Sequence, residues 1–157
     1  MPGPHSPQIF INLPSTSLPL STPFYHALGF TTNATFSGPS TACFTLSPSI
    51  SVMLHTHAQF RDFMPGGKTL VDGRSGSEAL LCFTVATRED VDRVVEEAGM
   101  RGGRKDPTQL PKAEGWYGRS VEDPDGHVWE VGWMGGRGEG CGEREKEGEQ
   151  KEEREKE

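Results

Sequence analysis

The sequence repeats one order of elements twice, 70 positions apart, and this repeat limits the folds that the chain can adopt. Phe10 and Leu80 lie in apolar runs typical of strands, and Gly29 and Gly99 follow them at the same separation of 19 positions. Between strand and glycine, apolar residues recur at helical spacing, and short strand-like runs follow each glycine. The pattern predicts an α+β domain of two βαβββ modules, with eight strands and two main helices.

The modules are expected at about residues 8–57 and 78–134, within a single domain that covers 8–134. A connector rich in glycine and proline separates them. The last 23 residues, 135–157, hold nine Glu, six Lys or Arg and no large apolar side chain. Such a segment cannot bury enough apolar surface to offset the entropy lost on ordering. We therefore expect a disordered, charged tail after the domain.

Charge and composition argue against several classes of protein. The net charge is −7, and the tail, with nine acidic and six basic residues, leaves −4 on the domain, which disfavours a nucleic-acid partner. No apolar run approaches the ~20 residues of a membrane span, and the first residues do not form a secretory signal. Cys43, Cys82 and Cys141 form neither a disulfide framework nor a metal-knuckle spacing. The sequence thus predicts a cytoplasmic protein with no membrane partner.

The run EDPDGHVWEVGWM, residues 122–134, is typical of a buried strand except for the glutamate in its middle. Because strand residues alternate between faces, Trp129 and Trp133 share one face, and Glu130 shares the other with Gly132. Removing an unpaired carboxylate from water is costly. Glu130 should therefore face a charged partner, a metal ion or a wet cavity, while the tryptophan face requires cover from helices or another subunit.

The sequence resembles the vicinal-oxygen-chelate superfamily, which includes glyoxalase I, bleomycin-resistance proteins, fosfomycin-resistance enzymes and extradiol dioxygenases. The resemblance rests on FINLPSTSLPLSTPFYHALGF, at 10–30, and YGRSVEDPDGHVWEVGWM, at 117–134. It implies a cupped, partly closed eight-stranded sheet with helices outside and the ligand or metal inside the cup. It also implies a homodimer, because modules of this family often pair between chains. Glu130 matches the family's carboxylate ligand on the last strand.

The family's metal site takes one side chain from the first and last strand of each module. By the resemblance, the four positions in this sequence are Phe10, Leu54, Leu80 and Glu130. Divalent ions require several oxygen or imidazole donors, and a phenylalanine and two leucines supply none. We therefore expect no metal or other cofactor, with Glu130 as the only retained ligand position and the other three residues making the pocket apolar.

His55 and His57 are candidate substitute ligands, because residues two apart on a strand face the same way. Placing His55 inside the cup, however, requires a one-residue change of register from the family alignment. Tyr117 and Arg119 alternate along the preceding strand. Arg119 either forms an ion pair with Glu130 and neutralises its charge, or binds a polar ligand together with Tyr117.

Two functions follow from the resemblance. The first is binding, with or without conversion, of a small organic molecule in the cup by a protein similar to bleomycin-resistance proteins. Its metal site would be degenerate, with Glu130 as the candidate catalytic residue. The alternative is a metal-dependent enzyme, either a lyase of glyoxalase I (lactoylglutathione lyase) type or an extradiol dioxygenase, with Glu130 as ligand or base and a divalent metal as cofactor.

Overall fold

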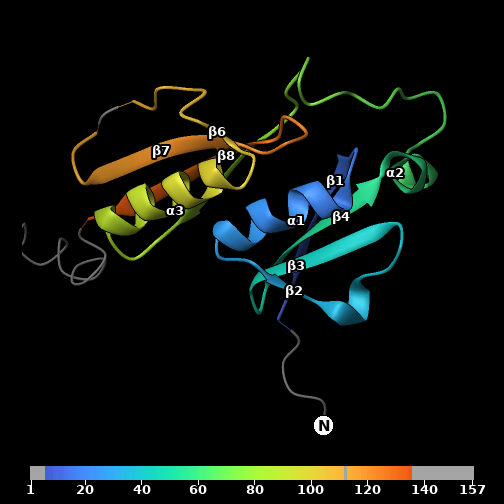
Figure 1. Cartoon of the computed structure of the whole chain (residues 1–157), viewed down its shortest axis with the longest axis horizontal. Coiled ribbons are helices and arrows are strands. Elements are labelled where there is room, and N and C mark those ends of the chain that lie inside the picture. The colour runs from blue at the N-terminus through green and yellow to red at the C-terminus, as the bar shows by residue number, and fades with distance from the viewer. Residues whose placement is uncertain (1–5, 112, 136–157) are drawn as a thin grey trace, which may run out of the picture.

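A computed structural model of the chain describes residues 6–111 and 113–135, which form two four-stranded sheets and three α-helices (Figure 1). The first module contains β1 (Ile9–Ser15), α1 (Leu18–Ala27), β2 (Thr31–Thr32), a 3-10 helix η1 (Ala34–Phe36), β3 (Thr41–Ser47) and β4 (Ile50–Thr56). Helix α2 (His57–Phe63) follows it. The second module contains β5 (Leu80–Thr84), α3 (Arg88–Met100), β6 (Arg104–Lys105), β7 (Trp116–Glu122) and β8 (Val128–Met134).

The two modules have the same topology. Their strand orders are β1-β4-β3-β2 and β5-β8-β7-β6. In each sheet the first and last strands of the module pair in parallel, and the remaining pairs are antiparallel. This arrangement confirms the α+β prediction of two βαβββ modules, and the strands of the described residues do not close into a barrel. Nearly all of the predicted tail, residues 136–157, lies outside the described residues.

The ends of the two main helices follow from local sequence. Helix α1 ends before Gly29, which adopts a positive φ of 94°. Helix α3 begins after Thr87, whose hydroxyl accepts a hydrogen bond from the Asp90 backbone N–H at 3.0 Å and so caps the helix. Gly99 lies inside α3, which continues for one more residue, to Met100.

The prediction that one strand extends to His57 is also wrong. Strand β4 ends at Thr56, whose hydroxyl accepts from the Gln59 backbone N–H at 3.4 Å and starts α2. His57 is consequently the first residue of a helix. It does not share a strand face with His55.

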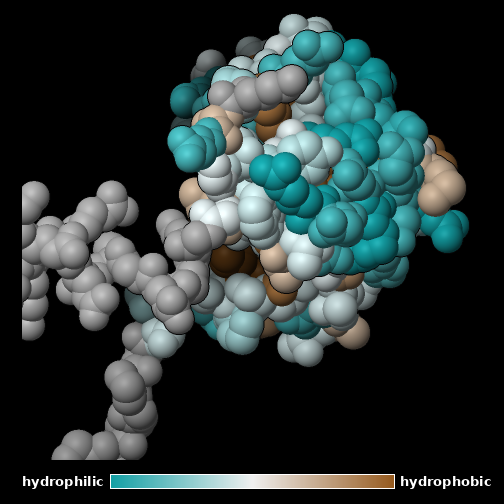
Figure 2. Space-filling model, turned by 90° about the vertical axis from the view of Figure 1, so that its left-hand side faces the viewer, coloured by the Kyte–Doolittle hydropathy of each residue, from teal (hydrophilic) through white to brown (hydrophobic). Residues whose placement is uncertain are grey.

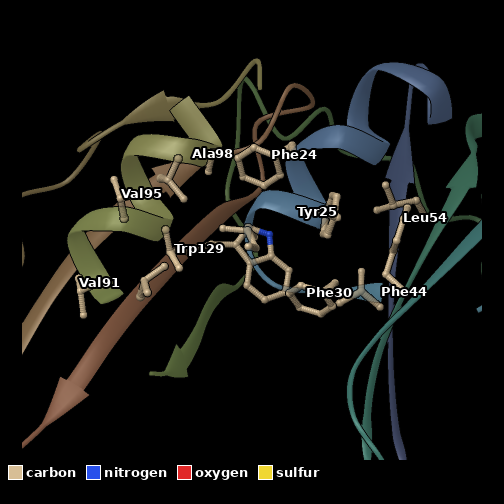
Figure 3. Packing of buried hydrophobic residues seen from close by; sticks show 14 of the residues in the cluster. Phe24, Tyr25, Phe30, Phe44, Leu54, Val91, Val95, Ala98 and Trp129 are labelled. Atoms are coloured by element: carbon tan, nitrogen blue, oxygen red, sulfur yellow. The ribbon is translucent and has the colours of Figure 1, made fainter. Parts of the chain in front are cut away.

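The core lies between the two modules and is formed by the helix-covered faces of both sheets (Figure 3). Helices α1 and α3 contact each other, and each packs against its own sheet. Tyr25 of α1 stacks on Phe44 of the first sheet at 5.2 Å between ring centroids, and meets Trp129 of the second sheet edge-on at 5.9 Å. The two sheets are therefore joined through their helices. Their opposite faces, here called the open faces, point away from this core.

The turn before β8 fastens the second module to the first through two buried carboxylates. Asp125 accepts hydrogen bonds from the hydroxyls of Ser15 at 2.6 Å and Ser21 at 3.2 Å, and from the backbone N–H of Thr16 at 2.8 Å. Asp123 accepts from the Tyr25 hydroxyl at 2.9 Å. The turn DPDG, residues 123–126, is thus also a polar contact between the modules.

Helix α3 presents a charged surface on its outer side. Arg93 pairs with Asp90 at 2.7 Å, and Lys105 pairs with Glu96 at 2.5 Å. Figure 2 shows a continuous hydrophilic area on the side of the molecule where α3 lies, next to a recess with apolar atoms at its base. In the part of the chain that is described, every helix is too short or too polar to cross a membrane.

Candidate functional site

The strand register shows which predicted site residues reach the open faces. Residues that pair across neighbouring strands share a face, so the positions on each open face can be followed from one strand to the next. The first open face carries Phe10, Asn12, Met53, His55 and Thr41, and the second carries Leu80, Cys82, Thr84, Glu130 and Gly132. Phe10 and Leu80 are 40% and 60% exposed. These two residues and Glu130 therefore lie on the open faces of the sheets.

The predicted pocket position of Leu54 is wrong. Its side chain is fully buried in the core, on the face that α1 covers. Neighbouring residues on a strand point to opposite faces, so Met53 and His55 take the open face instead. Met53 pairs with Asn12 as Glu130 pairs with Cys82, which lies 70 positions after Asn12. The alignment is therefore wrong by one residue, and a thioether stands where the prediction has a leucine. Methionine is no better a ligand for a hard divalent ion.

Tyr117 and Arg119 lie on the helix-covered face of the second sheet. The Tyr117 hydroxyl donates to Asp92 of α3 at 2.7 Å. Arg119 donates to Asp92 at 3.1 Å, to Glu96 at 2.9 Å and to Asp106 at 2.6 Å. These hydrogen bonds raise the pKa of the Arg119 guanidinium above its ordinary value. The predicted pairing of Arg119 with Glu130 is therefore wrong, because α3 supplies other carboxylates on the opposite side of the sheet.

Glu130 lies half-buried at the centre of the second open face. It pairs in register with Cys82 on β5 and Ser120 on β7. Among the described residues no hydrogen bond or ion pair to its carboxylate is found. Burial, followed by the nearby Glu130 charge, raises the pKa of the Cys82 thiol. Trp116 lies over Gly132, which is two residues beyond Glu130 on the same face, and a Cβ added at Gly132 would overlap the indole ring.

His55 is held on the first open face by two hydrogen bonds. Its Nε2 bonds the Asn12 Oδ1 at 2.8 Å, and its Nδ1 bonds the Thr41 hydroxyl at 2.7 Å. Phe63 of α2 packs on the ring at 5.1 Å between centroids, and the residue is only 2% exposed. Burial lowers the pKa of His55. Because Asn12 presents an oxygen, Nε2 carries the proton and Nδ1 accepts from Thr41.

The described residues do not fit a divalent metal site of the family's kind. No group of three or more His, Cys, Asp or Glu side chains in the described ranges could hold an ion. Both ring nitrogens of His55 are occupied, and His57 begins α2. One carboxylate, Glu130, is left as a donor, whereas divalent ions require several.

A cavity of about 860 Å³ lies at the junction of β1, α2, β5 and the connector 64–79. Its lining is mainly apolar: Ile11, Leu13, Phe60, Phe63, Leu70 and Leu81. Asn12, Lys68, Glu78 and His127 add polar groups. The cavity reaches the first open face at Asn12, whose side-chain oxygen is hydrogen-bonded to His55. Asn12 could not be predicted from the sequence, because its role depends on the cross-strand contact with His55.

The fold defines a class of proteins that are built from two βαβββ modules. Comparison with known proteins identifies a family of this class. The family model described as Glyoxalase/Bleomycin resistance protein/Dioxygenase superfamily matches residues 9–131. The chain belongs to this superfamily. No match is found among curated proteins.

Solved structures of the same fold are similar to the chain. Hypothetical protein SA1046 from S. aureus is 24% identical with a TM-score of 0.66, over 83% of this chain and 96% of that one. A glyoxalase-related enzyme from Fulvimarina pelagi is 22% identical with a TM-score of 0.65, over 78% and 84%. Protein ATC0852 from Agrobacterium tumefaciens is 25% identical with a TM-score of 0.60, over 84% and 100%.

Proposed function

We propose that this protein binds a small organic molecule and holds no resident divalent metal. The observation that carries the proposal is the composition of the open faces. Phe10, Met53 and Leu80 occupy positions where metal-using relatives would need donors, and Glu130 is the remaining carboxylate. Apolar walls with few polar groups are typical of small-molecule sites. A binding role similar to that of bleomycin-resistance proteins suits this composition.

The alternative is an enzyme of glyoxalase I or extradiol dioxygenase type. One observation favours it: Glu130 is half-buried, and its carboxylate has no partner among the described residues. A carboxylate of this kind is available as a general base or as one ligand of an ion that a substrate helps to coordinate. Under this alternative a divalent metal accompanies the reaction, and Glu130 is the catalytic residue.

Elemental analysis of the purified protein separates the two functions. We expect far less than one zinc, nickel, iron or manganese per chain, because one carboxylate with waters binds such ions weakly. Native mass spectrometry should detect a bound small molecule. Replacing Glu130 with glutamine should preserve the fold and change the affinity for that molecule, whereas Glu89→Gln on α3 should not. A stoichiometric metal lost on Glu130→Gln would establish the alternative.

We also propose that the protein is a homodimer in which a second copy covers the open faces. Among the described residues of one chain the modules meet through α1 and α3, so the open faces carrying Phe10 and Glu130 are not packed together. Large apolar side chains are exposed on these faces, with Leu80 at 60% and Met134 at 43%. Strands β1 and β5 are also sheet edges. Exposed apolar patches and open edges of this kind mark association surfaces.

Sedimentation velocity tests the dimer. We expect Leu80→Asp to weaken dimerisation at least about tenfold, because it places a charge in an apolar contact. Leu20→Asp is the matched control, since Leu20 is 68% exposed on α1, away from the open faces. A wild-type protein that sediments as a monomer at high concentration would contradict the proposal.

A further inference from the structure

The connector 64–79 lines the cavity described above, and contacts near its middle attach it to the turn before β8. At Gly73 the connector touches the turn before β8 so closely that an added Cβ would lie 2.7 Å from the Asp125 carbonyl oxygen. Next to it, the Arg74 guanidinium contacts the Asp125 carboxylate at 3.3 Å and the Thr16 hydroxyl at 3.2 Å. The cavity therefore has a fixed wall on this side, formed by backbone contact rather than by a loose loop.

The cavity is large enough for a small organic molecule and is mainly apolar. Sites for drug-sized ligands have volumes of about 300–1,000 Å³ and mostly hydrophobic linings, and the 860 Å³ here falls in that range. Two large apolar side chains of the lining, Phe63 and Val71, are 64% and 53% exposed, so the mouth is apolar as well. One lysine, Lys68, and one glutamate, Glu78, balance each other's charge in the lining. This balance favours an uncharged ligand.

One polar group in the lining has a fixed direction. The Asn12 Oδ1 faces His55, and its Nδ2 donates one proton to the Phe10 carbonyl oxygen at 3.2 Å. A side-chain amide has two N–H groups, and the second has no acceptor among the described residues. A hydrogen bond to Thr41 orients the His55 ring, and a hydrogen bond from His55 orients the Asn12 amide. The amide is thus oriented before any ligand arrives, which lowers the entropic cost of binding.

We propose that this connector cavity binds an uncharged, largely apolar molecule that carries a hydrogen-bond acceptor, such as a carbonyl oxygen, for the Asn12 amide. The inference goes beyond the proposed function, because this cavity lies outside the open-face positions that support that proposal and its lining does not include Glu130. His55 is a positioning residue in this site, acting through Asn12.

Two fluorescent probes of similar size test both parts of the proposal. Prodan is an uncharged naphthalene with a ketone oxygen, and N-phenyl-1-naphthylamine is uncharged and lacks a carbonyl group. We expect the wild-type protein to bind both saturably, at one site per chain. Ala79→Trp should weaken both probes about tenfold or more by filling the mouth. Ala58→Trp is the matched control, because Ala58 is an exposed alanine on α2 outside the lining.

The amide contact is tested by the ratio of the two affinities. Asn12→Ala should weaken prodan about threefold to tenfold, the value of one neutral hydrogen bond, and leave N-phenyl-1-naphthylamine unchanged. Asn12→Leu keeps the size of the side chain and should give the same ratio, so either variant serves if the other fails to fold. Equal losses of both probes would refute the role of the amide.

Other results would overturn the proposal. If Ala79→Trp binds both probes like the wild type, the connector cavity is not the site. If Leu80→Asp alone abolishes probe binding, the site lies on the open faces; the proposed function then stands while this inference fails. If Ala79→Trp changes the oligomeric state and the probes bind only monomer, a second copy occupies the cavity. Failure of native mass spectrometry to find any bound molecule would count against the proposed function itself.

Discussion

Replacing Asp125 with alanine should lower the free energy of unfolding by about 3 kcal/mol. The Asp125 side chain accepts from Ser15, Thr16 and Ser21 of the first module, and the residue is only 4% exposed. Without the carboxylate the buried hydroxyls of Ser15 and Ser21 and the part-buried N–H of Thr16 lose this acceptor. Each group left unsatisfied costs about 1–3 kcal/mol. The loss falls on the contact between the modules, so we expect it in global unfolding.

Urea denaturation of the wild type and the Asp125→Ala variant measures this loss. Arg74→Ala is the control that separates the ion pair from the buried hydrogen bonds. The Arg74 side chain is 51% exposed, so its contact with Asp125 should contribute less than about 1 kcal/mol. Equal losses in the two variants would show that the ion pair, and not the hydroxyl cluster, holds the modules together.

The effect of Asp125 should depend on pH in acid. Burial alone would raise the pKa of the carboxyl, but the hydrogen bonds from Ser15 and Thr16 outweigh it, so the pKa in the folded protein is lowered. A group with a lowered folded pKa contributes stability above its unfolded pKa, about 3.9 for aspartate. That contribution is lost as the pH falls through the lower folded value. The difference between wild type and variant should therefore be constant near neutrality and shrink below about pH 4.

The module arrangement could be predicted because it depends on patterns that repeat along the chain. The spacing from Phe10 to Gly29 and from Leu80 to Gly99 contains a strand and a helix in each half, and both appear. Helical and strand periods are local properties, so they can be found without knowing any long-range contact. The same holds for the Thr87 cap, which is formed within one turn of helix.

The site was harder to predict because it depends on register and on partners far along the chain. A shift of one residue moves a strand's side chains to the other face, and this explains why Leu54 lies in the core while His55 reaches the open face. Arg119 bonds Asp92 rather than Glu130, because α3 lies on that side of the sheet. The alternation of residues along one strand does not specify which residue of another element a side chain will contact. The family alignment does not specify it either.

The polar contact between the modules also escaped the sequence analysis. The turn containing Asp125 follows from local residues, its proline and its glycine. The additional role requires Ser15, Thr16 and Ser21, which lie more than 100 positions earlier. In the sequence, the cluster of hydroxyl residues between β1 and α1 is the signal that indicates this contact.

Replacing Gly126 with alanine should be among the most destabilising single changes in the chain, at about 4 kcal/mol. Two separate costs add at this position. Gly126 has a φ of +94°, which residues with a Cβ adopt at a cost of about 1–2 kcal/mol. A Cβ at Gly126 would also overlap the backbone of Gly73 in the connector. Because the obstacle is backbone, relief requires moving the connector off the turn.

Two other glycines isolate these costs. Gly29 has the same φ of +94°, and no atom lies within 4 Å of an added Cβ, so Gly29→Ala should cost about 1.5 kcal/mol from conformation alone. Gly73 has no positive φ, but its Cβ would lie 2.7 Å from the Asp125 carbonyl oxygen, so Gly73→Ala should cost about 2 kcal/mol from contact alone. The two variants thus separate backbone strain from the approach of the connector.

Urea denaturation of the three variants gives the comparison. If both costs act at Gly126, its loss should approach the sum of the losses at Gly29 and Gly73, because the two control sites do not share contacts. A loss at Gly126 no greater than that at Gly29 would mean that the connector yields freely. In that case the connector would not form a fixed wall of the cavity, and Gly73→Ala should also be nearly neutral. A large loss at both Gly73 and Gly126 would instead show that the turn before β8 holds the connector in place.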